Sequence, residues 1–404
     1  MLKIHKMCFL AYFVAVAIAI IIAISLLTCH PNFLPPNKQI IRGTPPRHLK
    51  YPSRNNMGEC PPLLGNVTVF VGFIAAMRKN TYDASLRTLM CYLKTTNYTL
   101  LLIDLDKDPR VQRGCGNHSM LFYKKHCAVA MYLPETDWML VLDADTGVVN
   151  PNHCIEEWID DRVDVLLYER FFNWEVAAGN YLVKNSNFGI KFLREFAKYE
   201  FKTPGKSWHG NDQGGLMMLL LKLLVPDATN EFNVCQDYWE KATNYDTYMA
   251  AVVCVRAALG AERIWPKKVR LFRKAEAFVR DGIITNEEWS QADFMLHGWK
   301  GRSVREWDGP FEHDIDPNKC GSGFEGWWWR SEKKKSIEEI RQVFLLLHNL
   351  RPVYGQEVWK NELFAKNMLE EVEDQYRSDF PDQAKVIPLF DKRNWCYPKC
   401  NHTN

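Results

Sequence analysis

The chain has 404 residues, 47% of them hydrophobic, which is enough for one large or two ordinary domains with a substantial core. Its 51 basic and 48 acidic residues leave a net charge of +3. A charge so near neutrality gives no electrostatic reason to expect binding to nucleic acid.

The N-terminus contains an apolar run without a charge from Met7 to Leu27, preceded by Lys3 and Lys6. At 1.5 Å per residue such a helix spans roughly 30 Å, the thickness of a bilayer core. A cleavable signal peptide is the alternative, but its apolar part is usually only about 7–15 residues long, and Leu-Thr-Cys-His-Pro is a poor cleavage site. We expect a cytosolic tail over 1–6 and an uncleaved single-pass anchor over 7–28, with the rest of the chain lumenal.

Two features agree with a lumenal chain. Triplets that accept N-glycosylation begin at Asn66, Asn97, Asn117 and Asn401. Ten of the twelve cysteines stand at Cys60 or later, an even number compatible with disulfides in an oxidising compartment. Their pairing is open: Cys396 and Cys400 could bridge locally, or each could join a distant cysteine.

Residues 29–65 are rich in proline and polar residues and predict an extended stem. The folded part, 66–330, begins with a β-branched and aromatic strand, 67–73. A helix with apolar residues at Leu86, Leu89, Met90 and Leu93 follows, then a strand over 99–103, a helix from 119 to about 133, and a strand from Trp138. This alternation predicts an α/β fold of the nucleotide-binding type, built on right-handed crossovers.

Further strands are expected at 163–168, 179–183 and 294–296, and helices at 186–198 and 216–224. Beyond Arg330 the sequence becomes charged, and apolar residues at Ile337, Ile340, Phe344 and Leu347 have helical spacing. We therefore expect a helical C-terminal extension over 331–404.

The apolar strand Met139–Leu142 stops in Asp143-Ala144-Asp145, followed by the turn residues Thr146 and Gly147. If the backbone stays extended, both carboxylates face one side while Ala144 turns to the core. Two neighbouring carboxylates repel each other, and a hard divalent cation is the usual reason to tolerate this. The alternative is ordinary capping of a strand end.

His297 follows the apolar segment Phe294–Leu296 and precedes Gly298 and Lys300. A histidine alone is more often structural than a ligand. Glycine beside it allows close backbone approach, and Lys300 suits phosphate oxygens. Asp143, Asp145 and His297 would suit Mn²⁺ or Mg²⁺ better than zinc, with a diphosphate in the remaining positions.

Four other candidates are weaker. Asp104 ends the second strand, where an acidic side chain typically reads a ribose or a base. Lys125, with Lys124 and His126, could be a solvated face or could reach phosphates. Asp212 and Gln213 lie in Trp208–Gly215 and could grip sugar hydroxyls, although capping of a helix by Asn211 or Asp212 explains much of that segment. Trp327–Trp329 could be an acceptor platform or core packing.

Taken together, LDADTGVVNP, GNYLVKNS, WHGNDQGG and HGWKG resemble a nematode family grouped with nucleotide-diphospho-sugar transferases. More distantly, the chain is similar to the yeast mannan and plant xyloglucan transferases and the glycogenin-like enzymes. With its expected tail, anchor and stem, its strand-end Asp-x-Asp and its late His-Gly-x-Lys, the chain resembles type II membrane glycosyltransferases of the GT-A fold, a Rossmann-type mixed sheet flanked by helices. The similarity covers Val67 to Lys300.

The resemblance implies a glycosyltransferase of the Golgi or endoplasmic reticulum membrane, with a nucleotide-diphosphate sugar as donor and a lumenal glycan or glycoprotein as acceptor. It implies that Asp143, Asp145 and His297 hold Mn²⁺, that Lys300 contacts phosphate, and that Asp212 and Gln213 line the sugar and acceptor side. Retention of configuration is what the nearest relatives suggest. Lys300 departs from the glycogenin-like pattern, because Gly301-Arg302 follows it in place of Pro-Trp.

Two other functions stay open at this point. A non-catalytic, lectin-like lumenal protein would keep the fold without turnover, and the presence of Asp143, Asp145, His297 and Lys300 argues against it. A metal-dependent phosphohydrolase would cleave simple phosphate esters without a sugar acceptor.

Overall fold

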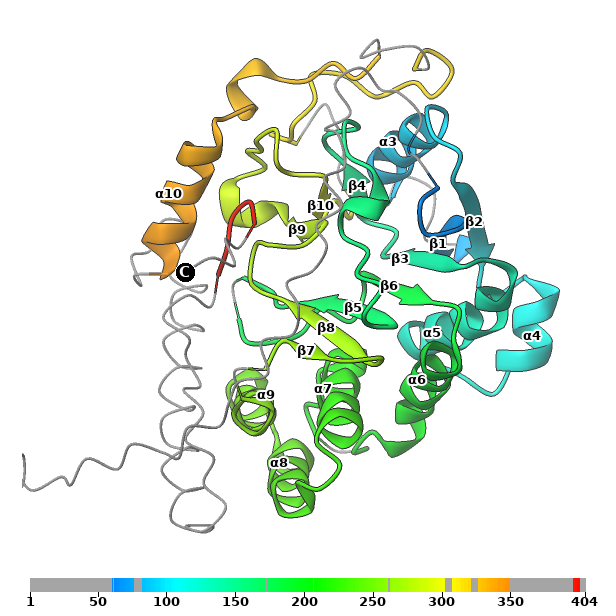
Figure 1. Cartoon of the computed structure of the whole chain (residues 1–404), viewed down its shortest axis with the longest axis vertical. Helices are drawn as coiled ribbons and strands as arrows, with labels where there is room; N and C mark the ends of the chain where they lie inside the picture. The colour runs from blue at the N-terminus through cyan, green and yellow to red at the C-terminus, as the bar shows by residue number, and fades with distance from the viewer. Residues whose placement is uncertain are drawn as a thin grey trace, which may run out of the picture. The chain divides into compact units, whose positions relative to one another are not determined.

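A seven-stranded mixed sheet organises the fold, in the strand order β2-β1-β3-β6-β5-β8-β7 (Figure 1). Its strands are β1 (Val67–Phe73), β2 (Thr99–Asp104), β3 (Trp138–Leu142), β5 (Val165–Tyr168), β6 (Tyr181–Lys184), β7 (Ile264–Trp265) and β8 (Val269–Phe272). Strand β1 is parallel to β2 and β3, and β5 is parallel to β8. Strand β6 is antiparallel to both β3 and β5, and β7 to β8. The expected mixed α/β sheet is thereby confirmed.

The computed structural model describes residues 60, 62–75, 82–171, 173–205, 207–260, 262–301, 307–320, 326–348 and 395–399. All of them belong to one compact unit, Leu49–Asn404. The expected tail and anchor, the stem up to residue 59 and most of the C-terminal extension lie outside the described residues. Within the described part, no helix has both the length and the apolar character needed to cross a bilayer.

Eight α-helices are described: α3 (Asp83–Leu93), α4 (Pro109–Cys115), α5 (Leu121–Tyr132), α6 (Asn187–Lys198), α7 (Asn211–Leu224), α8 (Thr229–Lys241), α9 (Tyr245–Leu259) and α10 (Ile337–His348). Five short 3-10 helices are also described: η1 (Leu133–Glu135), η2 (Ile155–Glu157), η3 (Tyr199–Lys202), η4 (Gly282–Thr285) and η5 (Ser331–Lys333). Helix α10 begins where the apolar spacing predicted it.

A second, three-stranded sheet has the order β4-β10-β9, with β4 (Thr146–Val148), β9 (Val279–Asp281) and β10 (Met295–His297). Strand β10 is antiparallel to β4 and parallel to β9. The sequence predicted a turn at Thr146-Gly147, and this was wrong. Pairing with a strand that comes much later in the chain makes these residues extended, and local sequence carries no signal of it.

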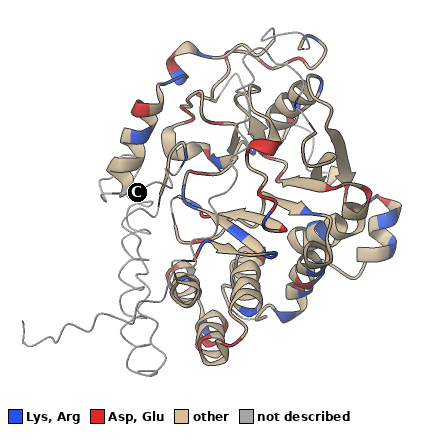
Figure 2. Cartoon of the chain, viewed as in Figure 1, with Lys and Arg blue, Asp and Glu red and all other residues tan. Residues whose placement is uncertain are grey.

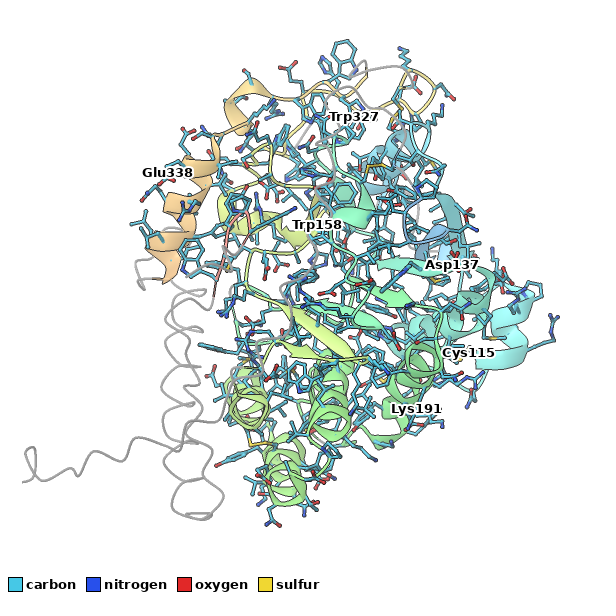
Figure 3. The ribbon with its side chains drawn as sticks, viewed as in Figure 1. Cys115, Asp137, Trp158, Lys191, Trp327 and Glu338 are labelled. Atoms are coloured by element: carbon cyan, nitrogen blue, oxygen red, sulfur yellow. A yellow bond between two sulfur atoms is a disulfide. The ribbon has the colours of Figure 1, made fainter. Side chains whose placement is uncertain are left out.

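Strand β3 shows why the large sheet is buried on both faces. Met139 and Val141 belong to the apolar core shared with α5, α6, α7 and α9. Leu140 and Leu142 belong to the core shared with α3 and the small sheet. Complete burial of such a side chain contributes about 1.5–3 kcal/mol, so an apolar run without alternation is what a strand covered on both faces needs. Side chains fill the space on both sides of the sheet (Figure 3).

Several helices differ from the sequence prediction. Pro109–Cys115 is a helix that was not predicted. It forms because the carboxylate of Asp108 accepts from the backbone N–H groups of Arg110 and Val111, and Pro109 fits the first helical position. Helix α7 starts five residues before the expected Leu216. Helices α8 and α9 were not predicted at all, and Cys235–Cys254 joins them.

Four disulfides connect described cysteines: Cys60–Cys154, Cys91–Cys320, Cys115–Cys127 and Cys235–Cys254. They support folding in an oxidising, secretory-pathway compartment. Asn66, Asn97 and Asn117 are exposed, as glycosylation acceptors must be, whereas Asn401 and Cys400 lie outside the described residues.

Basic and acidic side chains are interspersed over the described elements (Figure 2).

Candidate active site

The chain turns sharply after β3. The backbone N–H of Thr146 donates to the carbonyl of Asp143 at 3.0 Å, so the extended backbone expected through Asp145 is wrong. Ala144 is buried as expected, and its carbonyl accepts from the hydroxyl of Ser85. Asn180 accepts from the Asp143 N–H at 2.9 Å and from the Thr146 hydroxyl at 2.9 Å, which fixes the turn from the β6 side.

The small sheet brings His297 to this turn. Pairing of β4 with β10 sets His297 opposite Thr146. Immediately beyond, the N–H groups of Gly298 and Trp299 donate to the carbonyl of Asp145 at 3.2 and 3.0 Å. Backbone pairing therefore joins the Asp-Ala-Asp turn directly to the His-Gly-Trp segment.

Three side chains converge as a result. The Nε2 atom of His297 lies 3.7 Å from Asp143 Oδ2 and 3.4 Å from Asp145 Oδ1. One ligand atom from each of the three residues lies within 4.8 Å of the others, and all three side chains are half-buried. The structure thus brings together the three residues that the sequence suggested as metal ligands.

Asp281 holds the other side of the His297 ring. Strands β9 and β10 set the two residues side by side, and Asp281 Oδ1 lies 2.8 Å from His297 Nδ1. Arg170 in turn donates from Nη2 to Asp281 Oδ1 at 2.9 Å. Because Nδ1 is occupied by a carboxylate, Nε2 is directed at the two aspartates, the arrangement usual for metal-bound histidines.

Asp281 was not among the site residues predicted from the sequence. The available signal was Phe278-Val279-Arg280-Asp281-Gly282, a short strand-like run ending in an acidic residue and a glycine. The segment from Leu142 to Gly147 has the same pattern, in which a strand-like run is followed by acidic residues and a glycine. Arg170 had no comparable signal, because its role depends on what β9 places beside it.

The electrostatics of the cluster favour a cation. Burial opposes protonation of His297, but the hydrogen bonds and charges of Asp145 and Asp281 raise its pKa to about 10. Burial likewise opposes ionisation of Asp143, yet Lys125 and His297 hold its pKa below the usual range. Asp143 is therefore kept charged, and its carboxylate attracts positive charge to the position that it shares with Asp145 and His297.

The donor set fits a divalent ion. Two carboxylates and one imidazole suit Mn²⁺ or Mg²⁺. Gly179 provides further support, because a Cβ at this residue would lie only 1.6 Å from Asp143 Oδ2. The backbone thus packs directly on the carboxylate, and no side chain can occupy the space next to it.

Lys125 on α5 also belongs to the site. Its ammonium donates to Asp143 Oδ1 at 2.6 Å and to the Gly179 carbonyl at 3.3 Å, and the side chain is buried. Burial opposes the charged form, but Asp143 and Asp212 raise the pKa of Lys125. Lys125 is therefore not part of a solvated face. It compensates one oxygen of Asp143 while the other faces His297.

Asp212 and Gln213 lie in the first turn of α7. The N-cap residue is Gly210, and no side chain caps the helix, so capping does not explain these polar residues. Asp212 Oδ2 lies 3.2 Å from Nε2 of His126, the residue after Lys125. Gln213 accepts through Oε1 from the N–H of Ala178, which precedes Gly179. Asp212 and Gln213 therefore each bind a residue that is adjacent in the chain to one that contacts Asp143.

Asp104 and Lys300 lie further out. Asp104 ends β2, which β1 separates from β3, a distance of roughly 10 Å between strands. Its carboxylate accepts from the N–H of Asp106 in its own turn. Lys300 is exposed, three residues beyond His297.

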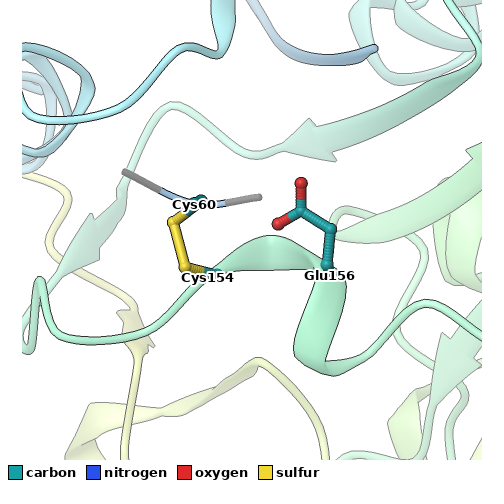
Figure 4. A group of neighbouring side chains, drawn as sticks. All are labelled: Cys60, Cys154 and Glu156. Atoms are coloured by element: carbon teal, nitrogen blue, oxygen red, sulfur yellow. A yellow bond between two sulfur atoms is a disulfide. The ribbon is translucent and has the colours of Figure 1, made fainter. Parts of the chain in front are cut away.

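A second group with metal-binding residue types is formed by Cys60, Cys154 and Glu156. Figure 4 shows that Cys60 and Cys154 are joined by a disulfide, so their thiolates are not available. Glu156 instead accepts a hydrogen bond from Tyr98. This group is structural.

Two of the three consecutive tryptophans are packing residues. Trp327 is buried and stacks on Trp329, whose Nε1 donates to the Val149 carbonyl at 2.8 Å. Trp328 between them is 50% exposed. Core packing therefore accounts for Trp327 and Trp329.

Comparison with protein families gives one match, over residues 89–309, which is more than half of the chain. The chain belongs to the family described as "Protein of unknown function, DUF273". That match includes Lys125, Asp143, Asp145, Asp212 and His297. No curated protein matches the chain.

Among solved structures, the chain is similar to one titled "crystal structure of a glycosyltransferase involved in the glycosylation of the major capsid of PBCV-1". The two are 13% identical with a TM-score of 0.30, and the alignment covers 41% of this chain and 78% of the other.

Proposed function

We propose that this protein is a metal-dependent glycosyltransferase that transfers a sugar from a nucleotide-diphosphate donor to a glycan or glycoprotein acceptor. One observation carries the proposal: Asp143, Asp145 and His297, from distant parts of the chain, converge around one point with Asp281 behind the imidazole. The motif resemblance to GT-A transferases implies the reaction class. The proteins that the chain resembles also suggest retention of configuration.

Each side chain has a role in this proposal. Asp143, Asp145 and His297 would hold Mn²⁺ or Mg²⁺, and the charge of such an ion would supply electrostatic stabilisation for a diphosphate leaving group. Asp281 orients His297, and Lys125 neutralises the inner oxygen of Asp143. Lys300 is assigned to phosphate, and Asp104 to the ribose or base.

Asp212 and Gln213 are assigned to the sugar and the acceptor hydroxyl. The hydrogen bond with His126 orients Asp212. Burial, reinforced by the charge of Lys125, lowers the pKa of His126 to about 4 despite the opposing carboxylate, so the ring is neutral. Tyr181 can then donate to its Nδ1, 2.9 Å away, leaving Nε2–H to donate to Asp212.

The proposed location is the lumen of the Golgi or endoplasmic reticulum. The four disulfides support an oxidising compartment. The uncharged run before residue 28 supports a single-pass type II anchor there.

A thermal-shift screen of the full chain against nucleotide sugars, with and without Mn²⁺, tests the function. A ligand at 100 times its dissociation constant adds about 2.7 kcal/mol of stability. We expect one nucleotide class to raise the melting temperature only with Mn²⁺, and Mn²⁺-dependent donor hydrolysis to accompany it.

The matched variants are the double change Asp143→Asn with Asp145→Asn, and Asp314→Asn at the exposed first aspartate of the Asp314-Ile-Asp316 triplet. The first should lose the Mn²⁺-dependent shift and the second should keep it. If no nucleotide sugar stabilises the wild type and the double variant changes stability alone, the lectin-like alternative is favoured. Cleavage of simple phosphate esters without an acceptor would favour a phosphohydrolase.

A further inference from the structure

Trp208 is a large aromatic side chain at the surface, 43% exposed, in the loop that leads into α7. Its ring centroid lies 5.5 Å from that of Tyr245 at 89°, and 5.2 Å from that of Tyr248 at 56°. Neither tyrosine ring is parallel to the indole, so neither stacks flat on it. With this exposure, a large part of the indole remains open to solvent.

The loop that carries Trp208 is held in place. The Trp208 N–H donates to the Ala242 carbonyl at 2.8 Å, and Trp239 Nε1 donates to the His209 carbonyl at 2.9 Å. Gly210 has φ +68°, and a Cβ there would lie 2.3 Å from the Tyr248 ring. Only glycine therefore allows the backbone to lie this close to Tyr248, and the indole is presented from a fixed position.

Hydrogen bonds join this aromatic group to the candidate active site. The Tyr248 hydroxyl donates to Glu175 Oε1 at 2.7 Å, and Gln213 Nε2 donates to Glu175 Oε2 at 3.3 Å. The other end of the Gln213 amide binds Ala178 beside Gly179, whose backbone packs on Asp143. Trp208 thus stands on the Gln213 side of the site.

Two polar residues, His209 and Asn211, follow Trp208 closely in the same loop. Nδ1 of His209 accepts from the Asn211 N–H at 3.0 Å, so in the neutral ring Nε2 carries the hydrogen and can donate to a ligand. The Asn211 side chain is exposed. An exposed aromatic ring with hydrogen-bonding residues in the same loop matches a pyranose ring, which has an apolar C–H face and a rim of hydroxyls. An apolar peptide would leave these polar groups unpaired.

We propose that Trp208, with Tyr245 beside it, forms a subsite that stacks a sugar ring of the acceptor glycan next to Gln213. The proposal rests on the transferase function above, and it names a carbohydrate as the acceptor. Its binding step can be measured without turnover.

The test is binding of the full chain to a printed glycan array, with and without Mn²⁺ and UDP. We expect the wild type to bind a subset of glycans and Trp208→Ala to bind them roughly tenfold or more weakly, the loss typical of a truncated aromatic anchor. Trp208→Phe should retain most of the binding, because it keeps a flat ring. Phe201→Ala is the matched control, since Phe201 is another exposed aromatic, on η3 and 57% exposed, that contacts His118.

Three results would overturn the subsite: no glycan bound by the wild type, unchanged binding by Trp208→Ala, or equal losses in Trp208→Ala and Phe201→Ala. A loss of UDP binding in Trp208→Ala with glycan binding intact would assign the ring to the nucleotide base and also refute the proposal. Mn²⁺ binding measured on the same samples keeps the outcomes separate. A chain that binds glycans through Trp208 but fails to bind Mn²⁺ refutes the transferase function and leaves the subsite.

Discussion

Asp281 shows how one residue outside the recognisable motifs determines what another can do. His297 could point either ring nitrogen at the aspartates, and the 2.8 Å contact of Nδ1 with Asp281 leaves Nε2 for them. Arg170 and the His297 hydrogen bond outweigh burial and depress the pKa of Asp281, so its carboxylate stays ionised. The metal affinity of the site should therefore depend on Asp281 as well as on the ligands.

Replacement of Asp281 by asparagine should weaken Mn²⁺ binding by about 10–100-fold, because the imidazole loses the anion that orients and polarises it. Titration of the full chain with Mn²⁺, followed by electron paramagnetic resonance of the free ion, measures this. Asp293→Asn is the control, since Asp293 is a buried carboxylate in the same region that pairs with Arg280 at 2.6 Å. Equal Mn²⁺ affinity in the two variants would show that Asp281 acts through stability alone.

At the scale of elements, the site depends on the pairing of β4 with β10. This pairing sets the Asp-Ala-Asp turn beside His297, and it leaves no room for a side chain at Gly147. A Cβ there would lie 1.9 Å from the Trp299 ring, which is fully buried and donates from Nε1 to Glu287 at 2.9 Å. The indole cannot yield without breaking that hydrogen bond, so the strands would have to separate.

Gly147→Ala should therefore lower the free energy of unfolding by about 1–3 kcal/mol, the usual cost of overpacking, and weaken Mn²⁺ binding at the same time. Chemical denaturation and the Mn²⁺ titration measure the two effects. Gly205→Ala is the matched control, because a Cβ at Gly205 meets nothing within 4 Å. Wild-type stability and Mn²⁺ affinity in Gly147→Ala would rule out a role of this close contact in shaping the site.

At the scale of the whole described unit, disulfides fasten segments that are far apart in the sequence. Cys91–Cys320 spans 229 residues and ties α3 to the segment 307–320. That segment places Trp307 and Phe311 against Trp299, with ring centroids 5.1 and 5.8 Å away. The cross-link therefore secures the packing behind His297.

Removal of this cross-link by Cys91→Ser with Cys320→Ser should lower the free energy of unfolding by about 2–4 kcal/mol, because the unfolded chain regains the freedom of a long loop. Removing Cys115–Cys127, which spans only 12 residues, should cost less. Denaturant titration of both variants measures the difference. A larger loss for the short loop would contradict the entropic explanation.

The sequence by itself was enough to predict the strands with strong apolar character and the α/β class. It was also enough to select those site residues that lie in recognisable motifs. Strand β3 is an example, because an unbroken apolar run of this kind is stable only when both faces of the strand are buried. The short strands β4 and β9 and the helices α8 and α9 were not predicted. Strands of three residues carry too little periodicity, and their pairing partners lie far away in the chain.

The same division applies to the site. Asp143, Asp145, His297 and Lys125 could be selected as residue types in suitable contexts. Their convergence, and the parts played by Asp281, Arg170 and Glu175, were decided by tertiary structure alone. The physical reason is that a carboxylate's partner is set by which strands pair, and strand pairing depends on contacts across the whole fold.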